Sequence, residues 1–147
     1  MNERTRVKIV RVDKTLPIPE YQTEGAVAFD LYAREDVTIA PKEIARIPGN
    51  IIIQTPPGFM LLVAPRSGTP RKYGLSIPQG VGIVDQDYCG PNDEIMLQLY
   101  NFTDEPVTIH RGTRLAQAVL VKIALAEFEE VREIAPNSRG GFGSTGF

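Results

Sequence analysis

The chain has 147 residues, a length that suits one domain with a core of ordinary size. Hydrophobic residues make up 42% of the sequence, which excludes a disordered composition, and no apolar run approaches the ~20 residues of a membrane span. The formal net charge is -2 with both signs mixed along the chain, so the basic stripe of a nucleic-acid groove is missing and we expect neither a nucleic-acid nor a membrane partner.

Short segments rich in β-branched residues recur along the chain, with turn residues and 12 prolines between them. Each segment is too short for a typical helix, which predicts an all-β domain built as a sandwich, jelly roll or barrel. In chain order, the predicted strands cover residues 7–12, 37–40, 51–53, 59–63, 94–100, 107–110 and 115–123.

The composition changes near the C-terminus. We expect a single all-β domain over residues 1–136, followed by a glycine-rich tail over residues 137–147 that has little to bury except Phe142 and Phe147. Most glycine-rich ends are frayed. The alternative is a flexible flap that closes over an active site, in which backbone amides and hydroxyls wrap an anionic ligand and Phe142 stacks on a ring.

Three segments before the tail carry residues suited to chemistry. Residues 65–68 follow an apolar strand and offer arginine, hydroxyl and amide donors to phosphate oxygens, although an exposed arginine in a turn is common. Residues 82–90 are predicted to form a hairpin whose acidic tip is either ordinary turn chemistry or a general base beside a stacking tyrosine. Asp30 is either a strand-end residue bonded to backbone or a carboxylate that binds a metal through water, as magnesium prefers.

The remaining candidates lie on the last predicted strands. Arg114 and Gln117 are separated by an odd number of residues, so we predict that they face opposite sides of the sheet. His110 is the only histidine and is predicted to be a polar strand-end residue without a catalytic part. With Cys89 as the only cysteine there is no Cys/His set for zinc and no intramolecular disulfide, so chemistry must rest mainly on carboxylates, arginines, hydroxyls and amides. The single cysteine and a charged start without a signal-peptide core indicate a cytoplasmic protein.

In their order, these segments resemble the conserved motifs of the trimeric dUTPases, the deoxyuridine triphosphate nucleotidohydrolases. The matching motifs are DLYA at residues 30–33, PRSG at 65–68, GIVDQDYCG at 82–90, GTRLAQ at 112–117 and GGFGSTG at 140–146. The resemblance implies a jelly-roll subunit of the β-clip kind in a homotrimer with active sites at the subunit interfaces. It implies hydrolysis of dUTP to dUMP and pyrophosphate with Mg²⁺, which limits uracil in DNA and supplies dUMP for thymidylate synthesis.

The resemblance also implies roles for single residues. Asp85 is expected to deprotonate a water that attacks the α-phosphorus in line, Asp30 to hold a water on the magnesium ion, and Tyr88 to pack beneath the deoxyribose and leave no room for a 2′-hydroxyl. The implied base and sugar contacts are Gln79, Gly82, Ile83, Val84, Tyr88 and Phe142. The implied phosphate contacts are Arg66, Ser67, Gly68, Gln117, Arg139, Gly143, Ser144 and Thr145.

The main alternative is a dCTP deaminase, or an enzyme with both activities, of the same fold and trimer. Such deaminases use a glutamate for proton transfer where this chain has Gln98, and an amide cannot carry a proton as a carboxylate can. A non-catalytic nucleotide-binding trimer or a structural jelly roll would leave Asp85 unexplained. Two departures from the family pattern stand out: Gln79 replaces a usual asparagine, and residues 91–93 resemble an insertion before Glu94.

Overall fold

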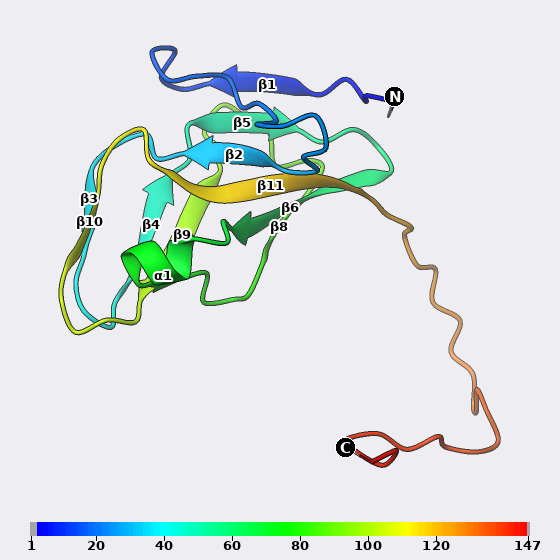
Figure 1. The fold of residues 1–147 in the computed structure, drawn as a ribbon. Helices are drawn as coiled ribbons and strands as arrows, with labels where there is room; N and C mark the ends of the chain where they lie inside the picture. The colour runs from blue at the N-terminus through cyan, green and yellow to red at the C-terminus, as the bar shows by residue number, and fades with distance from the viewer. Residues whose placement is uncertain (1–2, 147) are drawn as a thin grey trace.

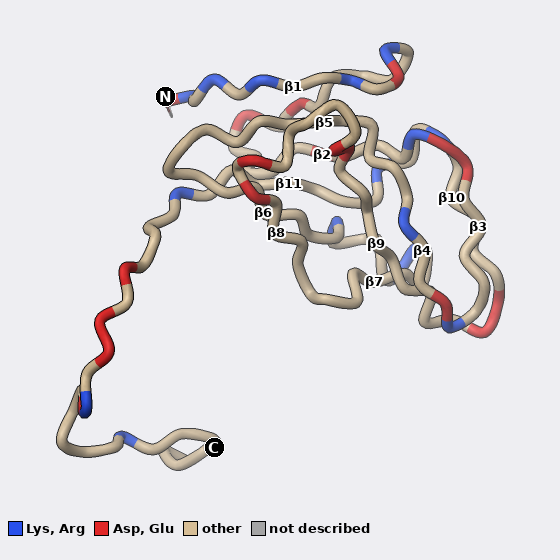
Figure 2. The backbone as a smooth tube through the Cα atoms, turned by 180° about the vertical axis from the view of Figure 1, so that it is seen from behind, with Lys and Arg blue, Asp and Glu red and all other residues tan. Residues whose placement is uncertain are grey.

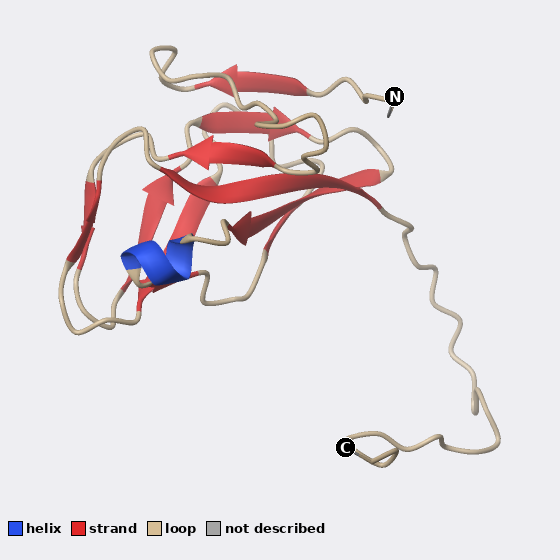
Figure 3. Cartoon of the chain, viewed as in Figure 1, coloured by secondary structure: helices blue, strands red, loops and turns tan. Residues whose placement is uncertain are grey.

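The computed structural model describes residues 3–146, and the regular structure in that part of the chain is almost entirely β, as predicted. One short helix, α1 (Thr69–Tyr73), stands among the strands of the described residues (Figures 1 and 3). The strands are β1 (Lys8–Arg11), β2 (Phe29–Tyr32), β3 (Val37–Ile39), β4 (Ile44–Pro48), β5 (Ile51–Gln54), β6 (Phe59–Pro65), β7 (Leu75–Ser76), β8 (Gly82–Val84), β9 (Met96–Asn101), β10 (Val107–Ile109) and β11 (Arg114–Lys122). None of the described helices is long and apolar enough to cross a membrane.

The strands pair in antiparallel fashion into four small sheets. The largest has the order β2-β11-β6-β8, and a second has the order β4-β9-β7. Strands β1 and β5 form one further pair, and β3 and β10 form a ribbon at the end of the body opposite the C-terminal segment (Figure 1). Because neighbouring side chains on a strand point to opposite faces, each sheet offers one apolar face to a shared core.

The core is made of aliphatic side chains from nearly every strand. Burying each leucine or isoleucine stabilises the fold by ~1.5–3 kcal/mol relative to exposure. The fully buried aliphatic side chains are Leu31, Ile39, Ile47, Ile51, Leu61, Leu75, Leu97, Leu99, Ile109 and Leu115. They tie the four sheets into one body, on which the candidate site residues are placed.

Strand β11 contains a bulge that corrects one prediction. Arg114 pairs with Tyr32, but Ala116 already pairs with Leu31, so Leu115 is the extra residue. The carbonyl of Leu115 accepts hydrogen bonds from the Arg66 amide at 3.3 Å and from the Thr69 hydroxyl at 2.7 Å. A bulge shifts the alternation of side chains along the strand.

The shift places Arg114 and Gln117 on the same face. Gln117 stands directly opposite Asp30, so these two side chains share a face of the sheet, and Arg114 Nη1 contacts Asp30 Oδ2 at 3.2 Å. The prediction that Arg114 and Gln117 face opposite sides is therefore wrong, because it assumed an unbroken strand.

The segment from Gly82 to Gly90 also differs from the predicted hairpin. Strand β8 pairs with β6 at the edge of the large sheet, and residues 85–95 form turns without a returning strand. Residues 91–93, which resemble an insertion, lie in one of these turns. The Asp93 carboxylate closes the turn by accepting a hydrogen bond from the Gly90 amide at 2.8 Å. Asp and Gly favour such turns, which explains why the chain leaves the sheet here.

The β body ends at the close of β11. The Ile123 amide still donates to the Gly58 carbonyl at 2.9 Å, but every described residue from Ala124 onward is exposed, and this arm runs away from the body (Figure 1). Acidic residues follow one another along its first half (Figure 2), at Glu127, Glu129, Glu130 and Glu133. Residues 123–136, which the sequence assigns to the domain, thus contain no strand, and the division of the chain at residue 136 stays a prediction.

Candidate active site

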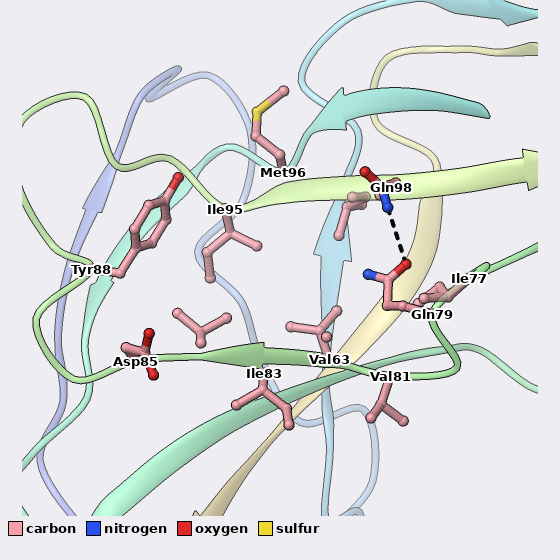
Figure 4. Close-up of a pocket in the computed structure, with 13 residues that line it drawn as sticks. Val63, Ile77, Gln79, Val81, Ile83, Asp85, Tyr88, Ile95, Met96 and Gln98 are labelled. Atoms are coloured by element: carbon pink, nitrogen blue, oxygen red, sulfur yellow. Dashed lines mark hydrogen bonds between the residues drawn. The ribbon is translucent and has the colours of Figure 1, made fainter.

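A cavity of about 430 Å³, called here the β8–β9 pocket, opens between β8 and β9. Its volume lies in the range of ~300–1,000 Å³ that is usual for small-molecule sites. The walls are mainly aliphatic, and Figure 4 shows polar groups at the two ends, Asp85 and Tyr88 at one and Gln79 and Gln98 at the other. The lining residues are Val63, Ile77, Gln79, Val81, Gly82, Ile83, Val84, Asp85, Tyr88, Ile95, Met96, Leu97 and Gln98.

Strand β8 forms one wall because glycine lets it approach β6 closely. A Cβ atom on Gly82 would lie 3.2 Å from the Val63 Cβ, closer than most real contacts. Among the described strands β8 pairs only with β6, so the amides and carbonyls on its other edge remain free for a ligand. This pocket brings together a set of residues that the sequence assigned to catalysis and to the base and sugar, namely Gln79, Gly82, Ile83, Val84, Asp85 and Tyr88.

The ring of Tyr88 is held in place through the backbone of Glu94. Its hydroxyl donates to the Glu94 carbonyl at 3.1 Å. The Glu94 carboxylate in turn accepts two hydrogen bonds from Arg34, at 2.8 and 2.9 Å, and one from the Asn50 amide at 2.9 Å. The hydrogen bond to Glu94 raises the pKa of the Arg34 guanidinium above its ordinary value. Turn 85–95 is thereby tied to the body through Glu94, near the start of β9.

Asp30 lies in a second cluster, between two arginines. Its carboxylate is only 6% exposed on β2 and contacts Arg66 Nε at 3.0 Å through Oδ1 and Arg114 Nη1 at 3.2 Å through Oδ2. Gln117 lies opposite Asp30 on β11 and donates from Nε2 to the Pro65 carbonyl at 3.1 Å. The cluster therefore brings together Asp30, Arg66 and Gln117, and it adds Arg114.

A cavity of about 250 Å³, called here the arginine pocket, opens beside this cluster. It is lined by Arg66, Ser67, Gly68, Thr69, Lys72, Tyr73 and Arg114. Three cationic side chains against one buried carboxylate leave an excess of positive charge, which favours an anion such as a phosphate. Neither Lys72 nor Arg114 is among the phosphate contacts that the family resemblance implies. The sequence holds a weak signal for Lys72, which is a basic residue four positions after Gly68. It holds no signal for Arg114, because the bulge that turns this side chain toward Asp30 cannot be read from the sequence.

The two pockets have no lining residue in common, and the tail reaches neither of them. Phe142, which the sequence assigns to the base, is fully exposed. The tail residues assigned to phosphate lie with it on the arm that extends from the body (Figure 1). Those residues are Arg139, Gly143, Ser144 and Thr145. A single chain thus brings the predicted site residues together in three separate groups.

Comparison with known proteins matches nearly the whole chain to one family. The model of the family described as dUTPase matches residues 14–146. The deoxyuridine 5′-triphosphate nucleotidohydrolase of Corynebacterium glutamicum is 43% identical over 149 residues, covering 99% of this chain and 98% of that protein.

Solved structures agree with this match. The dUTPase of Streptococcus mutans superposes with a TM-score of 0.76 at 30% identity, covering 83% of this chain and 98% of its own. The dUTPase of Staphylococcus bacteriophage 80alpha with dUpNHpp has a TM-score of 0.86 at 24% identity, covering 98% and 100%. The dUTPase of phage phi11 of S. aureus, described with a structural Mg(II) ion, has a TM-score of 0.78 at 22% identity, covering 88% and 98%. The two phage proteins share the fold.

Proposed function

Because the chain belongs to the dUTPase family, we propose that it hydrolyses dUTP to dUMP and pyrophosphate. The observation that carries this proposal is the β8–β9 pocket, in which a carboxylate and a tyrosine ring stand at one end of a nucleoside-sized cavity beside the free edge of a strand. The relatives named for dUTP hydrolysis match nearly the full chain. Such an enzyme would limit uracil in DNA and supply dUMP, and the single cysteine suits a cytoplasmic location.

The pocket would bind the deoxyuridine part of the substrate. The free backbone groups of Gly82–Val84 would bond the uracil edge as another strand would. The Tyr88 ring would pack beneath the deoxyribose, and its fixed position would exclude a 2′-hydroxyl by contact. Phe142 would close over the base when the tail folds onto the site.

Asp85 would carry the chemical step. It follows β8 directly and is exposed, so that a water molecule has access to its carboxylate. The carboxylate takes a proton from this water while the water oxygen bonds to the α-phosphorus, and the bond from the α-phosphorus to the bridging oxygen breaks to release pyrophosphate. Arg66 and the amides of Ser67 and Gly68 would stabilise the negative charge on the phosphates, together with Gln117 and the tail residues Arg139, Gly143, Ser144 and Thr145.

The residues present fit magnesium as a companion of the triphosphate. The described residues contain no group of three or more His, Cys, Asp or Glu side chains that could hold a metal ion alone. Magnesium keeps several waters and binds one or two carboxylates together with substrate phosphates, so it needs no such group. Asp30 would hold one of these waters through lone pairs that Arg66 and Arg114 leave free. When bound, the ion would neutralise part of the negative charge on the phosphates.

A homotrimer would complete the site. The β8–β9 pocket and the arginine pocket share no lining residue, and the tail reaches neither in one chain, so we expect residues from different copies to meet at one site. The arm also exposes Leu125, Phe128 and Ile134 by 87%, 94% and 95%. A second copy of the chain is the partner that would bury them, because large exposed apolar side chains mark interaction surfaces.

Product analysis tests the proposed function. Purified protein with magnesium is offered dUTP or dCTP separately, and the products are separated by chromatography. We expect dUMP and pyrophosphate from dUTP and no product from dCTP. A deoxyuridine product from dCTP would favour the deaminase alternative, and bound but unreacted dUTP would favour a non-catalytic nucleotide binder.

A further inference from the structure

A chain of side-chain hydrogen bonds enters the far end of the β8–β9 pocket from outside. Arg46 on β4 stands directly opposite Gln98 on β9 and donates from Nε to Gln98 Oε1 at 3.5 Å. Gln98 donates from Nε2 to Gln79 Oε1 at 3.3 Å (Figure 4). Gln79 and Gln98 line the pocket, whereas Arg46 is not one of its lining residues. These three residues are called here the amide relay.

The amide relay has a direction that the arginine sets. A guanidinium group only donates hydrogen bonds, so Gln98 must turn its carbonyl oxygen toward Arg46. Its amino group is then left for Gln79, which must accept with its own carbonyl oxygen. The amino group of Gln79 is the free end, and it points into the pocket (Figure 4). A cation outside the pocket thus determines that Gln79 presents a donor and not an acceptor.

The position of Gln79 matches one atom of a bound pyrimidine. Asp85 and Tyr88 mark the end of the pocket where the sugar and phosphates would lie, and Gln79 marks the opposite end. In a pyrimidine ring, position 4 lies across from the nitrogen that bonds the sugar, so its substituent points away from the sugar. Uracil carries a carbonyl acceptor there, and cytosine carries an amino donor.

We propose that Arg46 and Gln98 are positioning residues that keep Gln79 as a donor and thereby select uracil nucleotides over cytosine nucleotides. The proposal rests on the proposed function, since it assigns the far end of the same pocket to the base. The amino group of Gln79 would donate a hydrogen bond to the carbonyl oxygen at position 4 of uracil. On cytosine it would meet the amino group at position 4, which is a second donor. The mismatch sets two amino groups against each other, so a cytosine nucleotide loses the hydrogen bond that a uracil nucleotide makes with Gln79.

The variant Gln98→Glu tests the relay because it keeps the size of the side chain and reverses its polarity. A carboxylate only accepts, so Glu at this position would pair with Arg46 and would take a hydrogen bond from the Gln79 amino group. Gln79 would then present its carbonyl oxygen to the pocket. We expect the ratio of the Kd for dCMP to the Kd for dUMP, measured by calorimetry, to fall by about tenfold.

Three further variants keep the test decisive. Gln54→Glu adds the same charge at an exposed position on β5 outside the pocket and should leave the ratio unchanged. Arg46→Leu removes the donor that orients Gln98 and should lower the ratio several-fold even if Gln98→Glu does not fold. Arg46→Lys keeps a donor and should keep the ratio near that of the unchanged chain.

The outcomes separate this inference from the proposed function. An unchanged ratio in both Gln98→Glu and Arg46→Leu, in a chain that still hydrolyses dUTP, would overturn the relay and leave the function intact. An equal fall in the Gln54→Glu control would show a charge effect and overturn it as well. An unchanged chain that neither binds dUMP nor hydrolyses dUTP would remove both proposals.

Discussion

The charge balance around Asp30 shows how one buried carboxylate orders the arginines beside the arginine pocket. Arg114 on β11 and Arg66, directly after β6, approach the same carboxylate, and two neighbouring guanidiniums repel each other without an anion between them. Asp30 offsets that repulsion and fixes both side chains with charge-assisted hydrogen bonds. One unit of positive charge remains, and Lys72 adds to it at the rim of the pocket.

Replacing Asp30 with asparagine should weaken the fold and the phosphate site together. The two arginines are partly exposed, so water screens part of their repulsion and the free energy of unfolding should fall by ~1–2 kcal/mol. We expect urea unfolding to show this loss and the KM for dUTP to rise. Asp104→Asn is the matched control, because its side chain is 93% exposed and forms a surface ion pair with Lys42, across 3.4 Å. An equal loss in both variants would mean that the buried position of Asp30 has no importance.

Replacing Asp85 with asparagine should remove turnover and keep binding. The amide has nearly the same size but cannot take the proton of the attacking water, so kcat should fall by at least ~100-fold. Calorimetry with dUMP should give a Kd close to that of the unchanged chain, because the Asp85 carboxylate is not needed to hold the base. Turnover near the original rate would exclude Asp85 as the general base.

At the scale of elements, turn 85–95 holds the tyrosine that we propose to pack beneath the sugar. The turn has no strand of its own, and Arg34, Asn50 and Glu94 anchor it to the body through hydrogen bonds. The Tyr88 ring depends on this anchor, because its hydroxyl bonds the backbone of the same Glu94. Selection against a 2′-hydroxyl is thus expected to depend on how firmly the turn is held.

The variant Tyr88→Ala should therefore lose much of its preference for dUTP over UTP. Without the ring, nothing in the turn occupies the space next to the sugar, and the ratio of kcat/KM for the two substrates should fall about tenfold or more. Tyr88→Phe is the comparison, since it keeps the ring and loses only the bond to Glu94, and it should retain most of the preference. If Tyr88→Ala discriminates as well as the unchanged chain, sugar selection must come from elsewhere.

The sequence predicts elements well where the local pattern suffices. Strands β1, β5, β6 and β11 are rich in β-branched or aliphatic residues and were predicted within a few residues. Strand β4 was missed because Arg46 and Pro48 interrupt its apolar pattern. It lies at the edge of its sheet, where proline is tolerated. Helix α1 was missed because five residues that include a proline show no helical periodicity.

In the site, too, the sequence predicts what depends on neighbouring residues and does not predict contacts between distant ones. The pocket residues around β8 are near one another in sequence, so motif and structure agree on them. The position of Arg114 depends on a bulge whose carbonyl is satisfied by Arg66 and Thr69, far away in the chain, and one sequence holds no signal of that contact. The amide relay likewise joins Arg46 to Gln98 across two strands and to Gln79 beyond them.

For the whole molecule, the arm and the tail behind it have different compositions and, we infer, different tasks. Leu125, Phe128, Val131 and Ile134 recur at every third position and are all exposed, a pattern that suits an extended segment lying on another surface. Residues beyond Arg139 are mostly glycine and hydroxyl residues, and Phe142 and several of the glycines have positive φ angles. The first segment can supply buried area between copies, whereas the second can supply amides to phosphates.

Removing residues 139–147 should separate these tasks. The shortened chain keeps the body and the apolar arm, so light scattering should still give the mass of a trimer, while dUTP hydrolysis should fall at least ~100-fold because the tail no longer excludes water or contacts phosphate. A chain ending at Ile123 is the comparison: it also loses the apolar arm, and its trimer should dissociate at higher protein concentration. Full activity in the first variant would make the tail a frayed end, and equal assembly in both would mean that copies of the chain meet through the β body alone.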